Sequence, residues 1–153
     1  MPMRSHVPPR RGLLIHVRMS ATPAGPLGTL TYLYLGTGKF SEDLAFYRDT
    51  LGAPLVWHFN KFGAQVAAFR VAAGPLIILA DHRPPGTCMP VFAVDDVDAT
   101  AAQLKGRGWH PDAGPFEIPD GPCYTFTDRS GNAFALLGKA RPGALEASYR
   151  PTG

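Results

Sequence analysis

The chain has 153 residues, of which 45% are hydrophobic and 18% are charged. A chain of this length and composition can bury a core, so we expect one globular domain rather than a disordered polymer. Its apolar runs are far shorter than the ~20 residues of a membrane-spanning helix. Two cysteines cannot form a disulfide framework. We therefore expect a soluble, cytoplasmic protein with free thiols and no membrane partner.

The net charge of +3 at pH 7 comes from the two ends of the chain. Residues 1–26 carry four arginines, five prolines and no acidic residue, and residues 141–153 carry a net charge of +1. The body, residues 27–140, has nine basic and eleven acidic residues, so no basic stripe predicts nucleic-acid binding. We expect a flexible basic, Pro-rich tail, one folded domain and a C-terminal tail over these ranges. Translation from Met19 is an alternative to translation from Met1.

The body contains an internal repeat with an offset of 57 residues. Five apolar positions of the first half recur in the second half at this offset. The corresponding pairs are Phe40 and Val97, Leu44 and Ala101, Tyr47 and Leu104, Phe69 and Phe126, and Leu79 and Leu136. The repeat predicts that residues 27–82 and 88–140 fold as two similar modules.

Each module has the pattern of one strand, one helix and three further strands. In the first module we expect strands near 29–36, 54–60, 64–71 and 75–81 and a helix over 40–51. In the second module we expect a strand near 89–92, a helix from Asp96 to about Arg107, strands near 109–113, 122–127 and 132–138, and a loop over 117–122. The sequence therefore predicts an α+β fold made of two tandem βαβββ modules.

Three segments of the chain carry the pattern of a known family. They are residues 44–52 (LAFYRDTLG), 91–98 (VFAVDDVD) and 126–136 (FTDRSGNAFAL). In this order and spacing they resemble the glyoxalase, bleomycin-resistance protein and extradiol-dioxygenase superfamily, also called vicinal oxygen chelate proteins. The resemblance covers residues 29–138. It implies two βαβββ modules that form a curled mixed sheet around a cleft, usually within a homodimer.

Members of this family that use a metal carry one ligand on the first and one on the last strand of each module. The matching positions in this chain are Tyr32, Ile78, Met89 and Ala135. The family has His, Gln or Glu at these positions, whereas Ile and Ala have no donor atom and Met offers only a thioether. We therefore expect no metal and no other cofactor. A displaced metal site using His58 and His82 is an alternative.

Successive side chains of a strand point to opposite faces of the sheet, and this alternation predicts which of them line the cleft. Those expected on its wall are Tyr32, Tyr34, Ile78, Met89, Val91 and Ala135, and those expected at its rim are Trp57, Phe59, Phe62, Trp109, Phe116 and Tyr124. An apolar wall with phenol groups suits a flat aromatic or hydrophobic molecule held by stacking and dispersion. The alternative is that these aromatic side chains close a core or a dimer interface.

No motif assigns a catalytic residue, since the chain has no G-x-S-x-G elbow, P-loop or C-x-x-C. Candidates for acid–base chemistry are His58, His110, Glu117, Asp120 and Tyr124. The first hypothesis is a metal-free relative that sequesters a small hydrophobic or aromatic molecule, as the bleomycin-resistance branch does with its drug. The second is an enzyme of the same superfamily, a lyase, isomerase, dioxygenase or thiol transferase that uses a displaced metal or side chains alone.

Overall fold

The computed structural model describes residues 22–61 and 63–140. Its elements are β1 (Thr29–Gly36), α1 (Phe40–Ala45), a π-helical continuation η1 (Phe46–Thr50), β2 (Leu55–Lys61), β3 (Ala64–Phe69), β4 (Leu76–Ala80), β5 (Cys88–Ala93), α2 (Val97–Lys105), β6 (Ala113–Ile118), β7 (Gly121–Thr127) and β8 (Ala133–Leu137). The order strand, helix and three strands occurs twice, as the sequence predicted. The expectations about residues 1–21, Phe62 and residues 141–153 lie outside the described residues.

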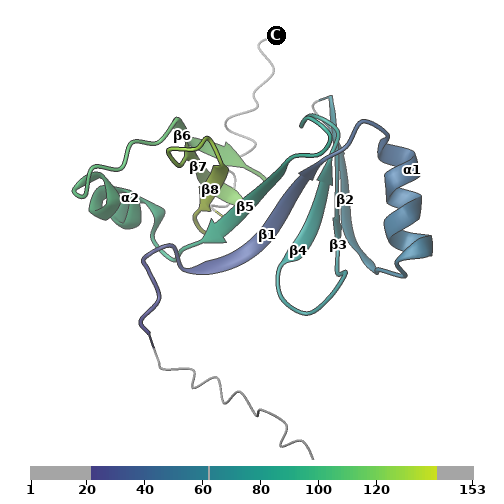
Figure 1. Ribbon diagram of the computed structural model, residues 1–153, viewed down its shortest axis with the longest axis horizontal. Helices are drawn as coiled ribbons and strands as arrows, with labels where there is room; N and C mark the ends of the chain where they lie inside the picture. Colours follow the sequence, from purple (N-terminus) through teal and green to yellow (C-terminus); the bar gives the residue numbers. More distant parts are fainter. Residues whose placement is uncertain (1–21, 62, 141–153) are drawn as a thin grey trace, which may run out of the picture.

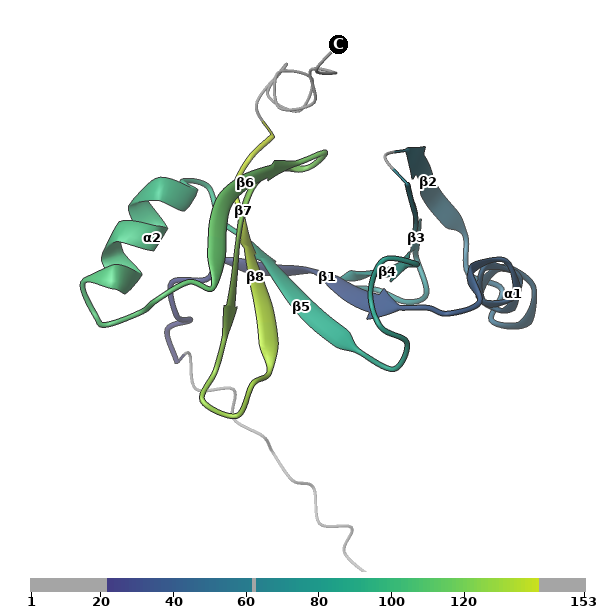
Figure 2. The same ribbon diagram turned by 90° about the horizontal axis from the view of Figure 1, so that it is seen from above.

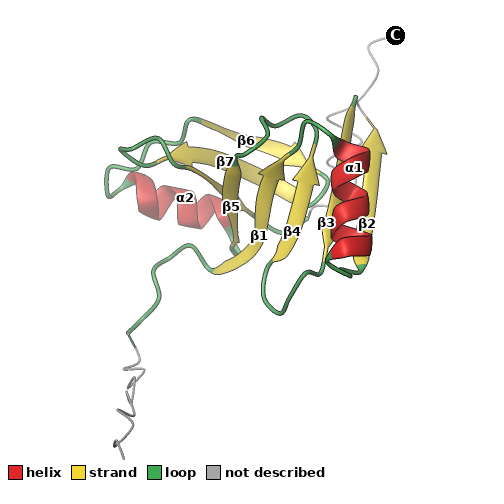
Figure 3. Cartoon of the chain, turned by 45° about the vertical axis from the view of Figure 1, so that its right-hand side comes forward, coloured by secondary structure: helices red, strands yellow, loops and turns green. Residues whose placement is uncertain are grey.

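The eight strands form one mixed sheet in the order β2-β3-β4-β1-β5-β8-β7-β6. Within each half the first and last strands pair in parallel, β1 with β4 and β5 with β8, and the two halves join through the antiparallel pair β1 and β5 (Figure 1). Figure 2 shows the sheet bent into a U, with α1 and α2 on its outer face; Figure 3 shows the same helices from the side. The predicted α+β architecture of two βαβββ modules is confirmed.

The cores under the two helices confirm the internal repeat. One buried cluster, under α1, contains Phe40, Ala67, Phe69 and Leu79, with Leu44 and Tyr47 packed against it. The cluster under α2 contains Val97, Ala101, Tyr124 and Leu136, with Leu104 and Phe126 packed against it. All five predicted residue pairs therefore occupy matching places in these two clusters. Ala67 and Tyr124, which also differ by 57, form a sixth pair.

The two helices begin differently. Asp96 caps α2 by accepting a hydrogen bond from the Ala99 N–H at 2.9 Å. At the start of α1 the capping position is Lys39, which cannot accept such a bond, and the Thr37 hydroxyl accepts the Lys39 N–H at 3.0 Å instead. Gly52, with φ +65°, allows the chain to turn away after η1, as the sequence predicted.

The position of β6 corrects the prediction for the second module. A strand was expected near 109–113 and a loop over 117–122, but the strand runs over Ala113–Ile118 and forms a tight hairpin with β7. The reason is that Trp109 packs its ring into the core beneath α2, so the segment after the helix follows the core and enters the sheet four residues later. A pattern of alternating residues cannot show this displacement.

No helix within residues 22–61 and 63–140 combines the length and the apolar character needed to cross a membrane.

Candidate functional site

The concave face of the sheet encloses a cavity of about 750 Å³. Strands of both modules contribute to it, since β1, β2, β3, β4, β5, β6, β7 and β8 all place side chains against it. Its apolar and aromatic lining consists of Tyr32, Tyr34, Trp57, Phe59, Val66, Ile78, Met89, Val91, Phe116, Ile118 and Ala135. A cavity of this size and lining can enclose a ligand of drug size.

Nine of the twelve residues predicted for the wall and rim of the cleft line this cavity, and Phe62 lies outside the described residues. The nine are Tyr32, Tyr34, Trp57, Phe59, Ile78, Met89, Val91, Phe116 and Ala135. Their positions follow from strand pairing: Tyr34 lies beside Ile78 on β4 and Met89 on β5, and Val91 lies beside Ala135 on β8. Whether these residues bind a ligand is part of the proposal below.

Trp109 and Tyr124 do not line the cavity, which corrects the prediction for both. Their rings meet edge to face at 5.7 Å between centroids, on the opposite side of the sheet under α2. Tyr124 occupies there the place that the small Ala67 has under α1, while Val97 replaces the larger Phe40 on the helix. The two exchanges compensate in volume, so the Tyr124 ring fills space that a helix side chain fills in the first module.

The four positions that match the metal ligands of the family all face the cavity. Tyr32, Ile78, Met89 and Ala135 line it together, as the repeat predicted. Ile78 and Ala135 have no donor atom, the Met89 thioether is soft, and burial together with Asp120 raises the pKa of Tyr32 to about 12. Because a phenol of that pKa is a poor anionic ligand, these residues do not fit the metals of the family.

The alternative metal pair, His58 and His82, does not form part of a cluster of donor side chains. Both residues border the cavity, but the His58 ring stacks on Phe40 at 5.5 Å between centroids, while Nε2 of His82 lies 3.3 Å from the Tyr34 hydroxyl. Within the described residues no three His, Cys, Asp or Glu side chains are grouped as a metal site would require. The displaced site is therefore not supported by the arrangement of donors.

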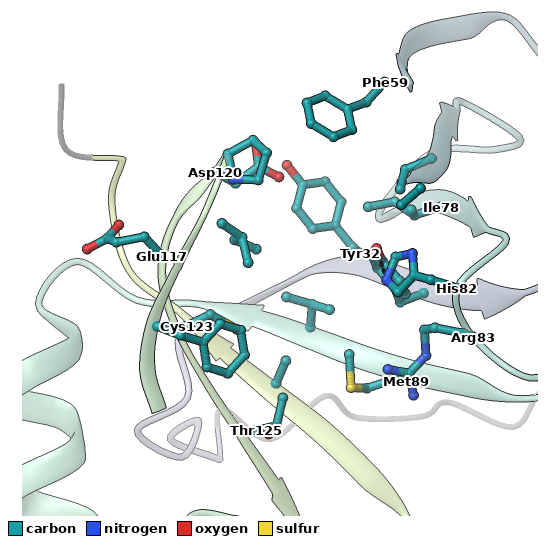
Figure 4. Close-up of a pocket in the computed structure, with 18 of the residues that line it drawn as sticks. Tyr32, Phe59, Ile78, His82, Arg83, Met89, Glu117, Asp120, Cys123 and Thr125 are labelled. Atoms are coloured by element: carbon teal, nitrogen blue, oxygen red, sulfur yellow. Dashed lines mark hydrogen bonds between the residues drawn. The ribbon is translucent and has the colours of Figure 1, made fainter. Parts of the chain in front are cut away.

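One polar pair in the cavity joins the two modules. The Tyr32 hydroxyl and the carboxyl group of Asp120, which sits in the turn between β6 and β7, lie side by side in the cavity (Figure 4), and each influences the ionisation of the other. Burial raises the pKa of Asp120 above that of an ordinary carboxyl group, and Tyr32 offsets part of this rise. This carboxyl group is the one among the predicted acid–base candidates that the fold places against a phenol in the cavity.

A second polar group forms the other side of the cavity. The Tyr34 hydroxyl and Nε2 of His82 lie 3.3 Å apart, and the Arg83 guanidinium carbon lies 5.6 Å from the centroid of the Tyr34 ring. Burial raises the pKa of Tyr34 to about 12, although Arg83 acts in the opposite direction. In Figure 4 the Arg83 side chain lies beside Met89 and apart from Asp120. The two polar groups therefore mark different ends of an apolar cavity.

The cavity is asymmetric although the modules repeat. Tyr32, Tyr34 and Trp57 of the first module correspond at the offset of 57 to Met89, Val91 and Gly114 of the second. At these three positions the first module supplies aromatic side chains, whereas the second has smaller ones, although Phe116 of the second module also lines the cavity. A ligand would stack on one wall and be enclosed by the other.

Cys123 also lines the cavity, and the sequence did not indicate it. Burial raises the pKa of this thiol to about 11, so it is protonated at neutral pH. Because the thiolate is the reactive form, Cys123 acts here as a small apolar side chain rather than a nucleophile.

Arg83 and Thr125 were also missed from the sequence. Tyr124 was expected at the rim of the cleft, but β7 turns Cys123 and Thr125 toward the cavity instead. The repeat held the correct signal, because Phe126 corresponds to the helix-facing Phe69 and Tyr124 lies on the same face as Phe126. Arg83 follows β4 in an irregular segment, where side chains do not alternate between two faces of a sheet.

Comparison with known proteins agrees with this architecture. The family model described as "Glyoxalase/Bleomycin resistance protein/Dioxygenase superfamily" matches residues 29–136. Proteins named "Putative glyoxylase CFP32" from Mycobacterium bovis and Mycobacterium tuberculosis are 33% identical over 126 residues, which is 78% of this chain. The chain spans 47% of the length of these relatives.

Solved structures show the same fold. A methylmalonyl-CoA epimerase from Mycobacterium tuberculosis superposes with a TM-score of 0.66 at 19% identity, covering 83% of this chain and 97% of that chain. A methylmalonyl-CoA epimerase from Streptomyces coelicolor, in complex with 2-nitronate-propionyl-CoA, gives a TM-score of 0.63 at 17% identity, covering 74% of this chain and 95% of that chain. At these identities the likeness concerns the fold alone.

Proposed function

Because the chain belongs to the glyoxalase/bleomycin resistance protein/dioxygenase superfamily, we propose that it binds a small, flat aromatic or hydrophobic molecule in its cleft without a metal. The observation that carries this proposal is the composition of the cavity. Aromatic side chains line the cavity, and the four positions of the family's ligands hold Tyr32, Ile78, Met89 and Ala135, of which Ile78 and Ala135 have no donor atom. Sequestration of a drug-like molecule is the role that we propose for this binding.

The proposal is tested by calorimetric titration of the full chain with 2-naphthamide, a neutral planar probe. Ala135 lies on the cavity wall, almost fully buried, so Ala135→Leu fills part of the binding space. We expect saturable binding at one site per chain and a loss of about tenfold or more in Ala135→Leu, which corresponds to about 1.4 kcal/mol. The matched control is Ala102→Leu on the exposed face of α2, which should bind as the wild type does.

Ala135→Leu also increases the volume of a packed wall, so its melting temperature is measured alongside. A folded Ala135→Leu protein that binds 2-naphthamide as tightly as the wild type would contradict binding in this cavity. Failure of the wild type to bind any of a panel of planar aromatic probes would contradict the proposed function itself.

One observation favours a second function, a cofactor-free enzyme that transfers a proton. Asp120 is a carboxyl group with a raised pKa in an apolar cavity, which is the setting of a general base. A binding protein returns its ligand unchanged, whereas such an enzyme exchanges a C–H proton next to a carbonyl group for deuterium in D₂O. Mass spectrometry of recovered ligands distinguishes the two, with Asp120→Asn as the variant that should lose exchange.

The same proposal includes a homodimer and a cytoplasmic location. A set of exposed apolar side chains on η1, on β2 and between them supports pairing of two copies; these are Phe46, Leu51, Leu55 and Val56. The free cysteines Cys88 and Cys123 suit a reducing compartment. Light scattering and cell fractionation test these two statements separately from ligand binding.

A further inference from the structure

The Arg83 guanidinium is an unused cation at the cavity. Its Nε is buried and has no hydrogen-bond partner in the structure. The ion pairs among the described residues join Lys39 to Glu42, Arg48 to Asp49, and Lys139 to Asp95, and none of them involves Arg83. Burying an N–H group without a hydrogen-bond acceptor raises the free energy of the folded protein. A hydrogen bond to a ligand therefore contributes more binding free energy here than at an exposed arginine.

The backbone that carries Arg83 is held in place by the end of β1. The Gly36 N–H donates a hydrogen bond to the Thr87 carbonyl oxygen at 3.1 Å, and the Thr87 hydroxyl donates to the Pro84 carbonyl oxygen at 2.7 Å. A Cβ atom at Gly36 would lie 1.9 Å from the same Pro84 oxygen, so only glycine permits this approach. Because this segment is already fixed without a ligand, binding costs little backbone conformational entropy.

We propose that Arg83 binds a carboxylate group carried by the aromatic ligand, so that the molecules this cleft selects are aromatic acids. A guanidinium matches a carboxylate through parallel hydrogen bonds, which a neutral ligand cannot replace. A cation–π contact, with 5.6 Å between the guanidinium carbon and the centroid of the Tyr34 ring, holds this cation at the wall of the cavity.

The charged side chains around the cavity favour a ligand with one negative charge, bound in one orientation. Lys61, Glu117 and Asp120 also line the cavity, and Asp81 is close enough to Tyr34 to influence its ionisation. In Figure 4 Glu117 points away from the centre of the cavity and Asp120 adjoins Tyr32, on the side away from Arg83. The carboxylate of the ligand would therefore lie at Arg83, and a dianion would meet repulsion from the acidic side.

This inference rests on the proposed function, and its test uses a pair of probes that differ in charge. The full chain is titrated calorimetrically at pH 7.5 with 2-naphthoate and with its neutral isostere 2-naphthamide. We expect the wild type to bind the naphthoate about tenfold more tightly or better. Arg83→Met should lose this preference while keeping its affinity for the amide. Arg107→Met, the same change at an exposed residue after α2, should keep the preference.

Equal binding of the two probes by the wild type, or an unchanged preference in Arg83→Met, would overturn the inference and leave the proposed function standing. Absence of binding by both probes in the wild type would overturn the proposed function instead. If Arg83→Met does not fold, Arg83→Gln is used, since it removes the charge but keeps a polar side chain: loss of the preference supports the inference and a retained preference refutes it.

Discussion

The hydroxyl of Tyr32, on β1, lies beside the carboxyl group of Asp120, in the turn between β6 and β7, and each influences the ionisation of the other. Tyr32 and Asp120 belong to different modules, and β1 and β6 lie at the centre and at one edge of the sheet. Strand order alone would separate them, and the curl of the sheet brings them together (Figure 2). The tip of the β6–β7 hairpin therefore lies over the concave face of the sheet, next to β1.

Asp120 should make folding stability depend on pH. Its folded-state pKa is raised by burial, so the folded protein holds this proton more tightly than the unfolded chain does. The stabilisation is fully present below the ordinary carboxyl pKa of 3.8 and is lost as the pH rises through the raised pKa. Asp120→Asn cannot ionise, so its free energy of unfolding should fall less steeply over this window. The difference in slope is at most about 1.4 kcal/mol per pH unit.

Urea unfolding between pH 4 and pH 7 measures this slope. Asp95→Asn is the control, because its side chain is 95% exposed and paired only with the exposed Lys139. Parallel profiles for the wild type and Asp120→Asn would contradict the burial of an ionisable carboxyl group in the cavity.

Truncation of a core side chain on the helix side of the sheet should strongly reduce the free energy of unfolding. Leu136 is fully buried under α2, so Leu136→Ala should reduce the free energy of unfolding by about 2–5 kcal/mol. Leu30→Ala removes the same atoms from a side chain that is 37% exposed and lies outside the proposed dimer surface, so it should cost far less. Chemical denaturation of both variants checks the difference. Equal losses would show that Leu136 is not in the core.

Gly121 should control the turn that presents Asp120. Its φ is +135°, and a Cβ atom there would lie 2.7 Å from the Gly138 carbonyl oxygen. Gly74 also has a positive φ, of +101°, but a Cβ atom at that position meets no atom within 4 Å. We expect Gly121→Ala to lower the melting temperature by clearly more than Gly74→Ala, whose strain alone costs about 1–2 kcal/mol. A smaller effect at Gly121 would contradict the close packing of this turn against the chain after β8.

The two tryptophans should respond differently to a ligand. Trp57 lines the cavity, while Trp109 is packed against Tyr124 and Phe126 under α2. On saturation with biphenyl-4-carboxamide, a neutral aromatic probe, we expect the tryptophan emission to change in the wild type and in Trp109→Phe. The change should be lost in Trp57→Phe, even where calorimetry still detects binding. A response that follows Trp109 instead would restore the rim position that the sequence predicted for it.

The sequence alone determined the architecture of this protein and one wall of its cleft. The 57-residue repeat and the periods of the apolar residues are local properties, and they were enough to predict both modules, their family and the faces of β1 and β5. The absence of donor atoms at Ile78 and Ala135 could also be read without coordinates, because a side chain's chemistry does not depend on its surroundings.

The tertiary structure decided which distant residues complete the cleft. Packing of Trp109 under α2 displaced β6, and the pairing of β6 with β7 placed Asp120 in the turn between them. Asp120 and Arg83 reach the cavity from irregular segments whose direction no periodicity describes. Their meeting with Tyr32 and Tyr34 depends on the curl of an eight-stranded sheet, which is set by long-range packing rather than by neighbouring residues.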